Sequence, residues 1–443
     1  MVDFLRKRLE GKKVLLLGFG QEGQSSFQVI RQALPEQEIC IADRNSSIRE
    51  MQVVQDDHHL DFQCGDDYLY GLDNFDVIIK SPGVSLKGII APFDRSIITS
   101  QTDLFLQAYA PQVIGVTGTK GKSTTCTLIA HILKTAGKDT ILLGNIGTPA
   151  FHFLDHIRAD THIVDELSSY QLEYIHRAPH LGVLLNFYEE HLDAYDSFRD
   201  YQLAKLNIAR FQVAQDVFVY NADDKFICEH LESINLKQKC VPFSLKSSFT
   251  RMESQNKHNR YLKGEHNWQN IQAAIIVSKL LDIDEETISD GVASFKGLAH
   301  RMEYVGFFHG IQWYNDSIAT IPEACTAAIR SLPDVDTLIL GGFDRGIGYD
   351  DLALFLINSG VKNLILMGDA GRRIGTEIEK TIKAGKKLFY INRFDDFLPI
   401  ALEHTRPGAT CLLSPAAASY DEFSSFEERG FRFRDLVEEV MRG

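Results

Sequence analysis

Residues 113–125 read Val-Ile-Gly-Val-Thr-Gly-Thr-Lys-Gly-Lys-Ser-Thr-Thr, and this stretch is the strongest indication of the fold class. It joins a short β-branched run, residues 113–116, to a helical pattern whose apolar residues between 128 and 133 share one face. A glycine-rich loop between a strand and a helix presents backbone N–H groups to phosphate oxygens. The stretch therefore predicts a phosphate-binding loop within a parallel α/β domain.

The side chains of this loop fit the same interpretation. Lys122 supplies a positive charge near the β and γ phosphates of a nucleotide, and Ser123 offers a hydroxyl ligand for Mg²⁺. Five residues separate Gly115 from Gly121, one more than in the usual phosphate-loop spacing. A turn without a ligand is the alternative, and the run from Gly121 to Thr125 in this strand-to-helix context argues against it.

On both sides of this loop, further short apolar runs alternate with helical patterns along the whole chain. This alternation is typical of α/β domains with mostly parallel, helix-covered sheets. We predict three domains at about 1–100, 101–300 and 301–443: a Rossmann-like domain, a central phosphate-loop ATPase-type domain with a mostly parallel sheet, and a second Rossmann-like domain. The other predicted strands are residues 14–17, 39–42, 77–79, 141–143, 163–164, 183–185, 338–340, 364–367 and 411–413.

Composition limits the class of protein. The 443 residues are 44% hydrophobic with a formal net charge of -14, which argues against a general nucleic-acid binder. No segment approaches the roughly 20 apolar residues of a membrane span, and the first ten residues lack a signal-peptide pattern, so we expect a cytoplasmic protein without membrane insertion. The seven cysteines show no CxxC pair and are expected to be reduced.

A second glycine motif, Gly18-Phe-Gly20-Gln-Glu-Gly23, follows the first predicted strand, and Asp43 ends the next one. Spacing and context match the dinucleotide fingerprint, which indicates a nicotinamide cofactor when taken alone. The diphosphate of a UDP-sugar would satisfy the same backbone turn equally well. A tight turn without any ligand is the third alternative.

Polar groups follow two buried runs of the central block. Asp165 and Glu166 end one run, and Asn186 and His191 follow another. Carboxylate, imidazole and hydroxyl groups near the phosphates of a nucleotide suit a divalent cation. Each residue taken separately is equally typical of a helix cap or a surface loop.

Polar segments later in the chain add to the pattern. Asn267 and Asn270, Arg301 and Asp316 lie in segments that in isolation are ordinary loops or caps. The most individual stretch is 414–430, Ser-Pro-Ala-Ala-Ala-Ser-Tyr-Asp-Glu-Phe-Ser-Ser-Phe-Glu-Glu-Arg-Gly.

Read in order, these motifs resemble the Mur ligase family over nearly the whole chain, and the first and last motifs resemble its glutamate-adding branch. The resemblance implies a first domain that holds a UDP moiety, a central domain that binds ATP, and a third domain that receives the amino acid and closes over the reaction.

The resemblance also assigns site residues. The implied ATP-binding residues are Gly118, Thr119, Lys120, Gly121, Lys122, Ser123, Thr124, Asn267, Asn270, Arg301 and Asp316. The implied UDP-substrate residues are Gly20, Gln21, Glu22, Gly23, Asp43, Arg44, Ser81, Pro82, Gly83 and Asn145. The implied glutamate-binding residues are Thr320, Arg345, Ser419, Tyr420 and Phe426, and the implied metal ligands are Ser123, Glu166, His191 and Lys205.

Three residues carry catalytic roles by the same resemblance: Lys122, His191 and Lys205. Lys205 matches the lysine that the family carbamylates with CO₂, which turns an amine into a carboxylate that positions Mg²⁺. Residue type alone indicates a lysine on a helix surface and cannot reveal the modification.

The implied activity is ATP-dependent ligation of glutamate, D-glutamate by default, to UDP-N-acetylmuramoyl-L-alanine through an acyl phosphate in peptidoglycan precursor synthesis. ATP, two Mg²⁺ ions and small-molecule substrates are the expected partners of a monomer. The alternatives are an L-glutamate variant, a nicotinamide-dependent oxidoreductase, a phosphate-loop switch without ligase chemistry, and a folylpolyglutamate synthetase, which the N-terminal diphosphate turn disfavours.

Two positions depart from the family pattern. Ile318 stands where the family has a lysine in Asp-Ser-Lys-Ala-Thr-Asn, and Arg345 replaces the lysine of the following Gly-Gly loop. Arginine binds a carboxylate bidentately with a longer, planar group, so recognition of the amino acid must differ in geometry. Both changes fall where the handedness of the amino acid is read, which keeps the L-glutamate alternative open.

Overall fold

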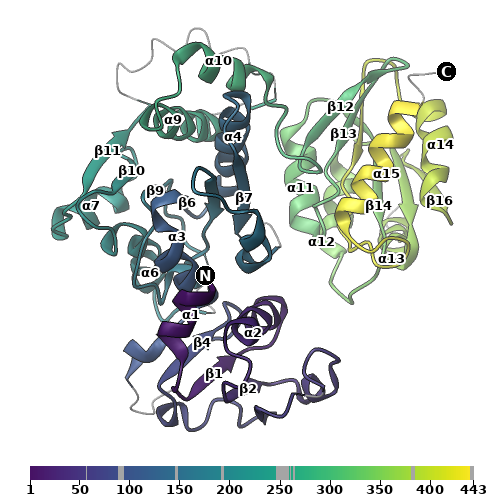
Figure 1. Ribbon diagram of the computed structural model, residues 1–443. Coiled ribbons are helices and arrows are strands. Elements are labelled where there is room, and N and C mark those ends of the chain that lie inside the picture. The colour runs from purple at the N-terminus through teal and green to yellow at the C-terminus, as the bar shows by residue number, and fades with distance from the viewer. Residues whose placement is uncertain are drawn as a thin grey trace. The chain divides into compact units, whose positions relative to one another are not determined.

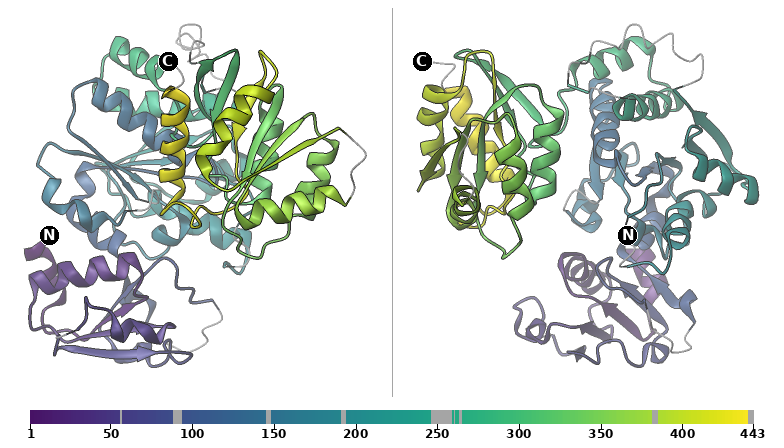
Figure 2. Two further views of the ribbon diagram at one scale, coloured as in Figure 1. Left: turned by 90° about the vertical axis from the view of Figure 1, so that its right-hand side faces the viewer. Right: turned by 180° about the vertical axis from the view of Figure 1, so that it is seen from behind.

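A computed structural model of the protein describes residues 1–55, 57–87, 94–144, 148–190, 194–245, 259, 261–262, 265–380 and 385–439. The chain forms two units, Met1–Phe295 and Lys296–Gly443. The first unit holds two sheets and the second holds one (Figure 1 and Figure 2).

The first sheet is built around β1, whose four residues are all buried because helices cover one face and loops the other. Its strand order is β3-β2-β1-β4-β5, and all pairs are parallel. Helices α1 (Val2–Leu9) and α2 (Gln21–Ala33) pack on one face through apolar residues at helical spacing. The strands are β1 (Val14–Leu17), β2 (Ile39–Asp43), β3 (Leu60–Cys64), β4 (Val77–Lys80) and β5 (Ile98–Thr99).

The second sheet carries the phosphate-loop motif. Its order is β11-β10-β9-β6-β8-β7, and all its pairs are parallel, so the carboxyl ends of the strands meet at one edge. The strands are β6 (Val113–Thr117), β7 (Thr140–Gly144), β8 (His162–Glu166), β9 (Leu181–Leu184), β10 (Val217–Asn221) and β11 (Lys239–Phe243).

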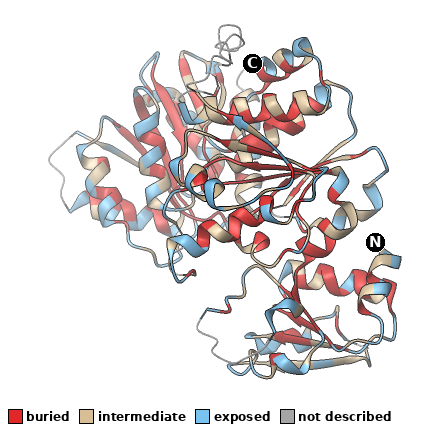
Figure 3. Ribbon diagram, turned by 90° about the vertical axis from the view of Figure 1, so that its left-hand side faces the viewer, coloured by how far each residue is buried: buried red, intermediate tan, exposed pale blue. Residues whose placement is uncertain are grey.

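Helices cover both faces of the second sheet. On one face α4 (Lys122–Thr135), α9 (Glu265–Leu280) and α10 (Glu285–Ser294) share a buried apolar cluster with the strands. On the other face lie α3 (Gln101–Tyr109), α5 (Ser169–Leu172) and α6 (Phe198–Arg210), while α7 (Lys225–Ser233) links β10 to β11. Burial follows this layering, with buried strands between helices whose outer faces are exposed (Figure 3).

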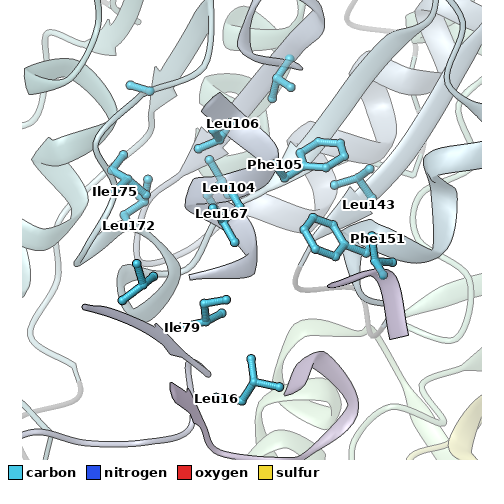
Figure 4. Packing of buried hydrophobic residues seen from close by; sticks show 14 of the residues in the cluster. Leu16, Ile79, Leu104, Phe105, Leu106, Leu143, Phe151, Leu167, Leu172 and Ile175 are labelled. Carbon is cyan, nitrogen blue, oxygen red and sulfur yellow. The ribbon is translucent and has the colours of Figure 1, made fainter. Parts of the chain in front are cut away.

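The two sheets of the first unit share one hydrophobic cluster. Leu16 and Ile79 of the first sheet belong to it together with Phe105, Leu143 and Phe151 of the central part (Figure 4). Apolar side chains in contact across the two sheets hold them as one body.

The sheet of the second unit has the order β12-β13-β17-β14-β15-β16, with β12 antiparallel and the rest parallel. Helices α11 (Pro322–Ser331), α12 (Asp350–Asn358) and α13 (Gly368–Glu379) cover one face, and α14 (Phe397–His404) and α15 (Phe426–Glu439) the other (Figure 2). The strands are β12 (Glu303–Phe308), β13 (Ile311–Asn315), β14 (Val335–Gly341), β15 (Asn363–Met367), β16 (Lys387–Ile391) and β17 (Thr410–Leu413).

The predicted α/β class with mostly parallel sheets is confirmed, and each predicted strand corresponds to an observed one. Among the described residues, no helix combines the length and the apolar character that crossing a membrane requires.

Candidate active site

The loop between β6 and α4 depends on two glycines. Gly118 has φ +152° and Gly121 φ +89°, backbone conformations that favour glycine. A Cβ at Gly118 would lie 2.9 Å from the Cβ of Leu185, and one at Gly121 would lie 2.3 Å from Oδ1 of Asn270. The loop therefore leaves no room for side chains at these two positions and exposes its backbone instead.

Lys122 opens α4, and its N-cap residue, Gly121, has no side chain that could cap the first turn. The Lys122 ammonium donates to the carbonyl oxygens of Gly118 at 3.0 Å and Thr119 at 3.1 Å. Burial lowers the pKa of this lysine, although Glu166 and Glu190 oppose the shift. Uncapped helix N–H groups beside a lysine form an anion site, so these residues fit the phosphates of a nucleotide.

Asn186 fixes the shape of the loop. Its backbone carbonyl accepts from the Thr119 N–H at 3.0 Å, and its side chain exchanges bonds with the Lys120 backbone at 2.8 and 3.0 Å. The Thr119 hydroxyl lies 2.9 Å from the hydroxyl of Tyr201 on α6. Asn186 and Tyr201 therefore hold the loop in its conformation without a bound ligand.

Lys205 lies one helical turn beyond Tyr201 and is 2% exposed. Its ammonium donates to Gly118 O at 3.0 Å and to the Thr117 hydroxyl at 3.3 Å. Burial lowers the pKa of this amine well below its ordinary range, and the nearby Lys122 lowers it further. Residue type alone suggested a lysine on the surface of a helix. This interpretation is wrong, because the side chain of Lys205 is buried and points from α6 to the phosphate loop.

The acidic pair Asp165 and Glu166 ends β8, and each residue is 2% exposed. Oδ1 of Asp165 is buried without a hydrogen-bond partner among the described residues. Burial raises the pKa of Asp165 to about 8, and Glu22 and Glu166 add to the rise. Gly144 makes room for this carboxyl, since a Cβ there would lie 2.3 Å from Asp165 Oδ1.

Glu166 is close enough to Lys122 and Lys205 to raise the pKa of both. Buried carboxyl groups beside the loop provide the oxygen donors that Mg²⁺ requires, so the donor set fits a divalent cation. Within the described part of the chain, no group of three or more His, Cys, Asp and Glu side chains could hold a metal ion. His191 and Asn145, both predicted site residues, lie outside the described residues.

The start of α9 lies against the phosphate loop. The side-chain amide of Asn270 donates to Oδ1 of Asn267 at 3.3 Å, and Asn270 is buried directly over Gly121. The structure thus brings the predicted ATP-binding residue Asn270 to the loop, with Asn267 hydrogen-bonded to it.

The first glycine turn is built by Gly18, which has φ +91°. The Ser81 hydroxyl donates to Gly18 O at 2.9 Å, so the Ser-Pro-Gly turn after β4 is joined to the glycine turn after β1. The Asp43 carboxylate accepts from the N–H groups of Phe19 at 2.7 Å and Asn45 at 2.8 Å. In this structure Asp43 organises the backbone around the turn.

A cavity of about 890 Å³ opens beside this turn. It is lined by predicted UDP-substrate residues, Gln21, Glu22, Pro82 and Gly83, and by Gly144 and Ser168 of the central part. The predicted residues Gly20, Gly23, Asp43, Arg44 and Ser81 do not line it. Its volume suits a large polar ligand.

A charged cluster at this cavity was missed by sequence reasoning. Lys80 ends β4 and is 3% exposed, with its ammonium 5.4 Å from the centre of the Tyr174 ring. Burial lowers the pKa of Lys80, while Glu173 and Glu22 raise it. The available signal was a lysine at the end of an otherwise apolar strand.

In the second unit, Asp316 follows β13 and is 5% exposed. It accepts from the Ser414 hydroxyl at 3.0 Å and from the Met302 N–H at 3.1 Å. Burial raises the pKa of Asp316 to about 6, and Arg301 acts in the opposite direction. Two predicted nucleotide-binding residues, Arg301 and Asp316, are therefore neighbours.

The predicted glutamate-binding residues gather at the carboxyl edge of the same sheet. The Arg345 guanidinium donates to Thr320 O at 2.7 Å. A bridge between Phe343 and Ala418 places that loop beside Ser419, which is buried, and Tyr420, which is 66% exposed. The Ser317 hydroxyl donates to the Phe426 carbonyl at 2.8 Å, which brings the start of α15 to the same edge.

Arg429 organises this edge and was missed as a site residue, because a single arginine on a helix gives no sign of its burial. It is 1% exposed and donates to Ser317 Oγ at 3.0 Å, Ser317 O at 2.9 Å, and the carbonyls of Ala417 and Ala418, both at 3.2 Å. Burial lowers its pKa to about 10, against the influence of Asp421. Its guanidinium ties α15 to the loops around Ser317 and Ser419.

Comparison with protein families matches two parts of the chain. Residues 116–278 match the Mur ligase middle domain, and residues 300–417 match the Mur ligase glutamate ligase domain.

Curated relatives match over most of their length. A UDP-N-acetylmuramoylalanine--D-glutamate ligase from Symbiobacterium thermophilum is 37% identical over 398 residues, 85% of this chain and 86% of the relative. An enzyme of the same name from Listeria monocytogenes is 32% identical over 451 residues, 97% of each chain.

Solved structures share the fold. A crystal structure of MurF from Acinetobacter baumannii superposes with a TM-score of 0.57 at 16% identity, covering 100% of this chain and 99% of the other. The predicted three-domain α/β architecture is thus found in a known structure.

Proposed function

Because the chain belongs to the Mur ligase family and is an ATP-dependent, amide-forming ligase, we propose that it joins glutamate to UDP-N-acetylmuramoyl-L-alanine in peptidoglycan precursor synthesis. The names of its relatives support D-glutamate as the amino acid. Because the chain belongs to this family, two alternatives raised by the sequence have no support: the nicotinamide-dependent oxidoreductase and the phosphate-loop switch without ligase chemistry.

The arrangement of two lysines at the phosphate loop is the main geometric support for this proposal. The ammonium groups of Lys122 and Lys205 both donate to Gly118 O, each at 3.0 Å. Two like charges converging on one buried carbonyl repel each other unless an anion lies between them or one amine loses its charge. The Glu166 carboxylate offsets part of this repulsion. Nucleotide phosphates beside a carbamylated Lys205 would remove the rest.

The reaction follows from the groups available. A carboxylate oxygen of the alanyl substrate attacks the γ-phosphorus of ATP, the bond to the ADP oxygen breaks, and an acyl phosphate forms. The amine of glutamate then attacks the acyl carbon, the bond to the phosphate oxygen breaks, and the amine loses a proton. Lys122 stabilises negative charge in both steps because its ammonium lies at the phosphate loop.

Mg²⁺ fits the same centre. We assign Ser123, Glu166, His191 and Lys205 as the residues that hold two Mg²⁺ ions, which neutralise the phosphate oxygens when bound. The buried carboxylate of Glu166 supports this assignment, as does Asp165 Oδ1, which has no hydrogen-bond partner among the described residues.

We assign a carbamate to Lys205. The neutral amine is the form that adds CO₂, releasing a proton as the C–N bond forms, and burial lowers the pKa of Lys205 in the direction that supplies it. A carbamate would also turn the repulsion between Lys205 and Lys122 into attraction.

The carbamate is testable by NMR with ¹³C-bicarbonate. We expect one protein-bound carbamate resonance in the wild type that is absent from Lys205→Ala and present in Lys237→Ala, a control at an exposed lysine. A wild-type spectrum without the resonance would contradict the assignment.

The UDP moiety is assigned to the cavity beside Gln21, Glu22, Pro82 and Gly83. Gln21 and Glu22, the first two residues of α2, line this cavity, and the N-terminus of a helix is a favourable place for a diphosphate.

The incoming glutamate is assigned to the edge formed by Thr320, Arg345, Ser419, Tyr420 and Phe426. Arg345 favours a second candidate, the L-glutamate variant, because its guanidinium is placed at Thr320 and binds a carboxylate in a different geometry from lysine. Ile318 strengthens this candidate by removing the other lysine of the family pattern.

ATP and the UDP-linked substrate are both made inside the cell, so we place the protein in the cytoplasm, and we propose that it acts as a monomer.

Phosphate release with MgATP and UDP-N-acetylmuramoyl-L-alanine tests the proposal. Dependence on D-glutamate supports the main candidate, and dependence on L-glutamate supports the second. Release that depends on neither amino acid would contradict both.

A further inference from the structure

The loop after β14 carries Arg345 at its tip and is anchored at its base. The N–H groups of Gly341, Gly342 and Phe343 donate to the carbonyls of Pro415 at 2.7 Å, Met367 at 2.8 Å and Ala418 at 3.0 Å. These bonds end two residues before Arg345, so they do not fix the tip.

Arg373 on α13 holds the tip instead. One terminal nitrogen of its guanidinium donates to both carboxylate oxygens of Asp344, at 2.6 and 2.8 Å, and the other donates to Ile347 O at 3.0 Å. Its guanidinium carbon also lies 5.2 Å from the centre of the Tyr349 ring. Arg373 therefore binds the loop on both sides of Arg345.

Asp344, which belongs to the loop itself, also restrains the loop. Besides its ion pair with Arg373, it accepts from the Gly346 N–H at 2.9 Å. The residues before and after Arg345 are thus joined through one carboxylate. The Arg345 side chain is exposed, and its guanidinium donates to the Thr320 carbonyl at 2.7 Å. Holding an exposed arginine in one conformation costs side-chain entropy, and this cost is greater when the backbone that carries it is also free to move.

We infer that Asp344 and Arg373 are positioning residues, whose ion pair holds the loop so that Arg345 is presented beside Thr320 to the carboxylate of the incoming amino acid. The inference rests on the proposed role of Arg345 in binding glutamate. In this inference both residues act through Arg345, because their described side-chain contacts are with each other and with the loop that carries it.

The pair contributes little to overall stability. The side chains of Arg373 and Asp344 are 44% and 21% exposed, and ion pairs at such positions contribute weakly to folding. A loop that presents a binding group must nevertheless be held closely, because small displacements of such a group cost binding.

Steady-state kinetics with Arg373→Ala test the inference. We expect the KM for glutamate to rise roughly tenfold, while kcat and the KM for ATP stay close to the wild-type values. Arg373→Lys keeps a charge for Asp344 and should show a smaller rise. Arg406→Ala is the matched control, because Arg406 forms an exposed ion pair with Asp334, with both distances 2.6 Å, elsewhere in the same unit.

A double-mutant cycle shows whether the effect passes through Arg345. If it does, Arg345→Ala with Arg373→Ala should have the same KM for glutamate as Arg345→Ala alone. Fully additive effects would overturn the inference, as would a loss of kcat with unchanged KM, which indicates general structural damage. If Arg373→Ala fails to fold, Asp344→Asn removes the ion pair and keeps an acceptor for Gly346.

Amide hydrogen exchange separates this inference from the proposed function. We expect the Gly346 amide to exchange faster in Arg373→Ala than in the wild type or in Arg406→Ala. Unchanged exchange would overturn the inference whatever the activity. Faster exchange in an enzyme that shows no dependence on glutamate would instead overturn the proposed function, and with it the role of Arg345.

Discussion

Among single residues, Glu22 shows how burial makes stability depend on pH. Its Oε2 is buried without a hydrogen-bond partner among the described residues, and burial raises its pKa from 4.5 to about 7 despite the opposing Lys80. The unfolded chain therefore ionises first as the pH rises. The free energy of unfolding should fall between pH 4.5 and 7 and stay lowered above that window.

We expect Glu22→Gln to raise the melting temperature at pH 8 and to change it little at pH 4.5. The gain in unfolding free energy at pH 8 is at most about 3 kcal/mol, from the size of the pKa shift. Thermal unfolding of both proteins at the two pH values measures it, with Glu36→Gln as the control at an exposed carboxylate. An equal gain at both pH values would show that ionisation is not the cause.

Residues in local motifs were predictable, whereas residues whose role depends on distant contacts were not. Lys122 was predicted because its spacing from the glycines is itself the signal. Arg429 contacts Ser317, which lies more than a hundred residues away in the sequence. Lys80 of the first sheet interacts with Glu173, which follows α5 in the central part of the same unit. No local pattern encodes such pairs.

Among the structural elements, the phosphate loop depends on the space above Gly121. Alanine there combines φ +89° with a Cβ only 2.3 Å from Asn270 Oδ1. A left-handed backbone costs alanine about 1–2 kcal/mol, and the clash in addition displaces the loop or α9.

We expect Gly121→Ala to weaken ATP binding by at least about tenfold, as measured by calorimetry. Gly137→Ala is the matched control, because Gly137 has φ +70° near the end of the same helix but nothing within 4 Å of its Cβ. Both variants should lose stability, and ATP binding should fall in Gly121→Ala alone. Equal ATP affinity in the two variants would contradict this role of Gly121.

Most of the predicted strands lie inside their sheets, although the edge strand β7 was predicted and the inner strand β13 was not. The buried strands β1, β6 and β14 stand out as apolar runs. The edge strands β3, β11 and β16 went unpredicted, because they face solvent and carry polar residues. β10 was missed although its apolar run was visible in the sequence.

For the molecule as a whole, the second unit has hydrophobic clusters of its own. The buried residues of its two clusters all lie beyond position 310, and those of the clusters in the first unit all lie before position 296. A unit with its own core can fold alone.

We therefore expect a fragment of residues 296–443 to unfold cooperatively. Trp313 is fully buried in its core and is the one tryptophan of the fragment, so its fluorescence should be blue-shifted and should change in a single thermal transition. Emission typical of a solvent-exposed indole would contradict the prediction.

All the assigned sites serve one reaction, the formation of an amide bond between glutamate and a UDP-linked alanyl carboxylate. Transfer of labelled glutamate into a uridine-containing product, with ADP measured in the same mixture, tests that reaction without intermediate assumptions. We predict one glutamate incorporated for each ADP formed, with no product when ATP or the UDP substrate is omitted. ADP formed without incorporation of either glutamate enantiomer would contradict the assigned function.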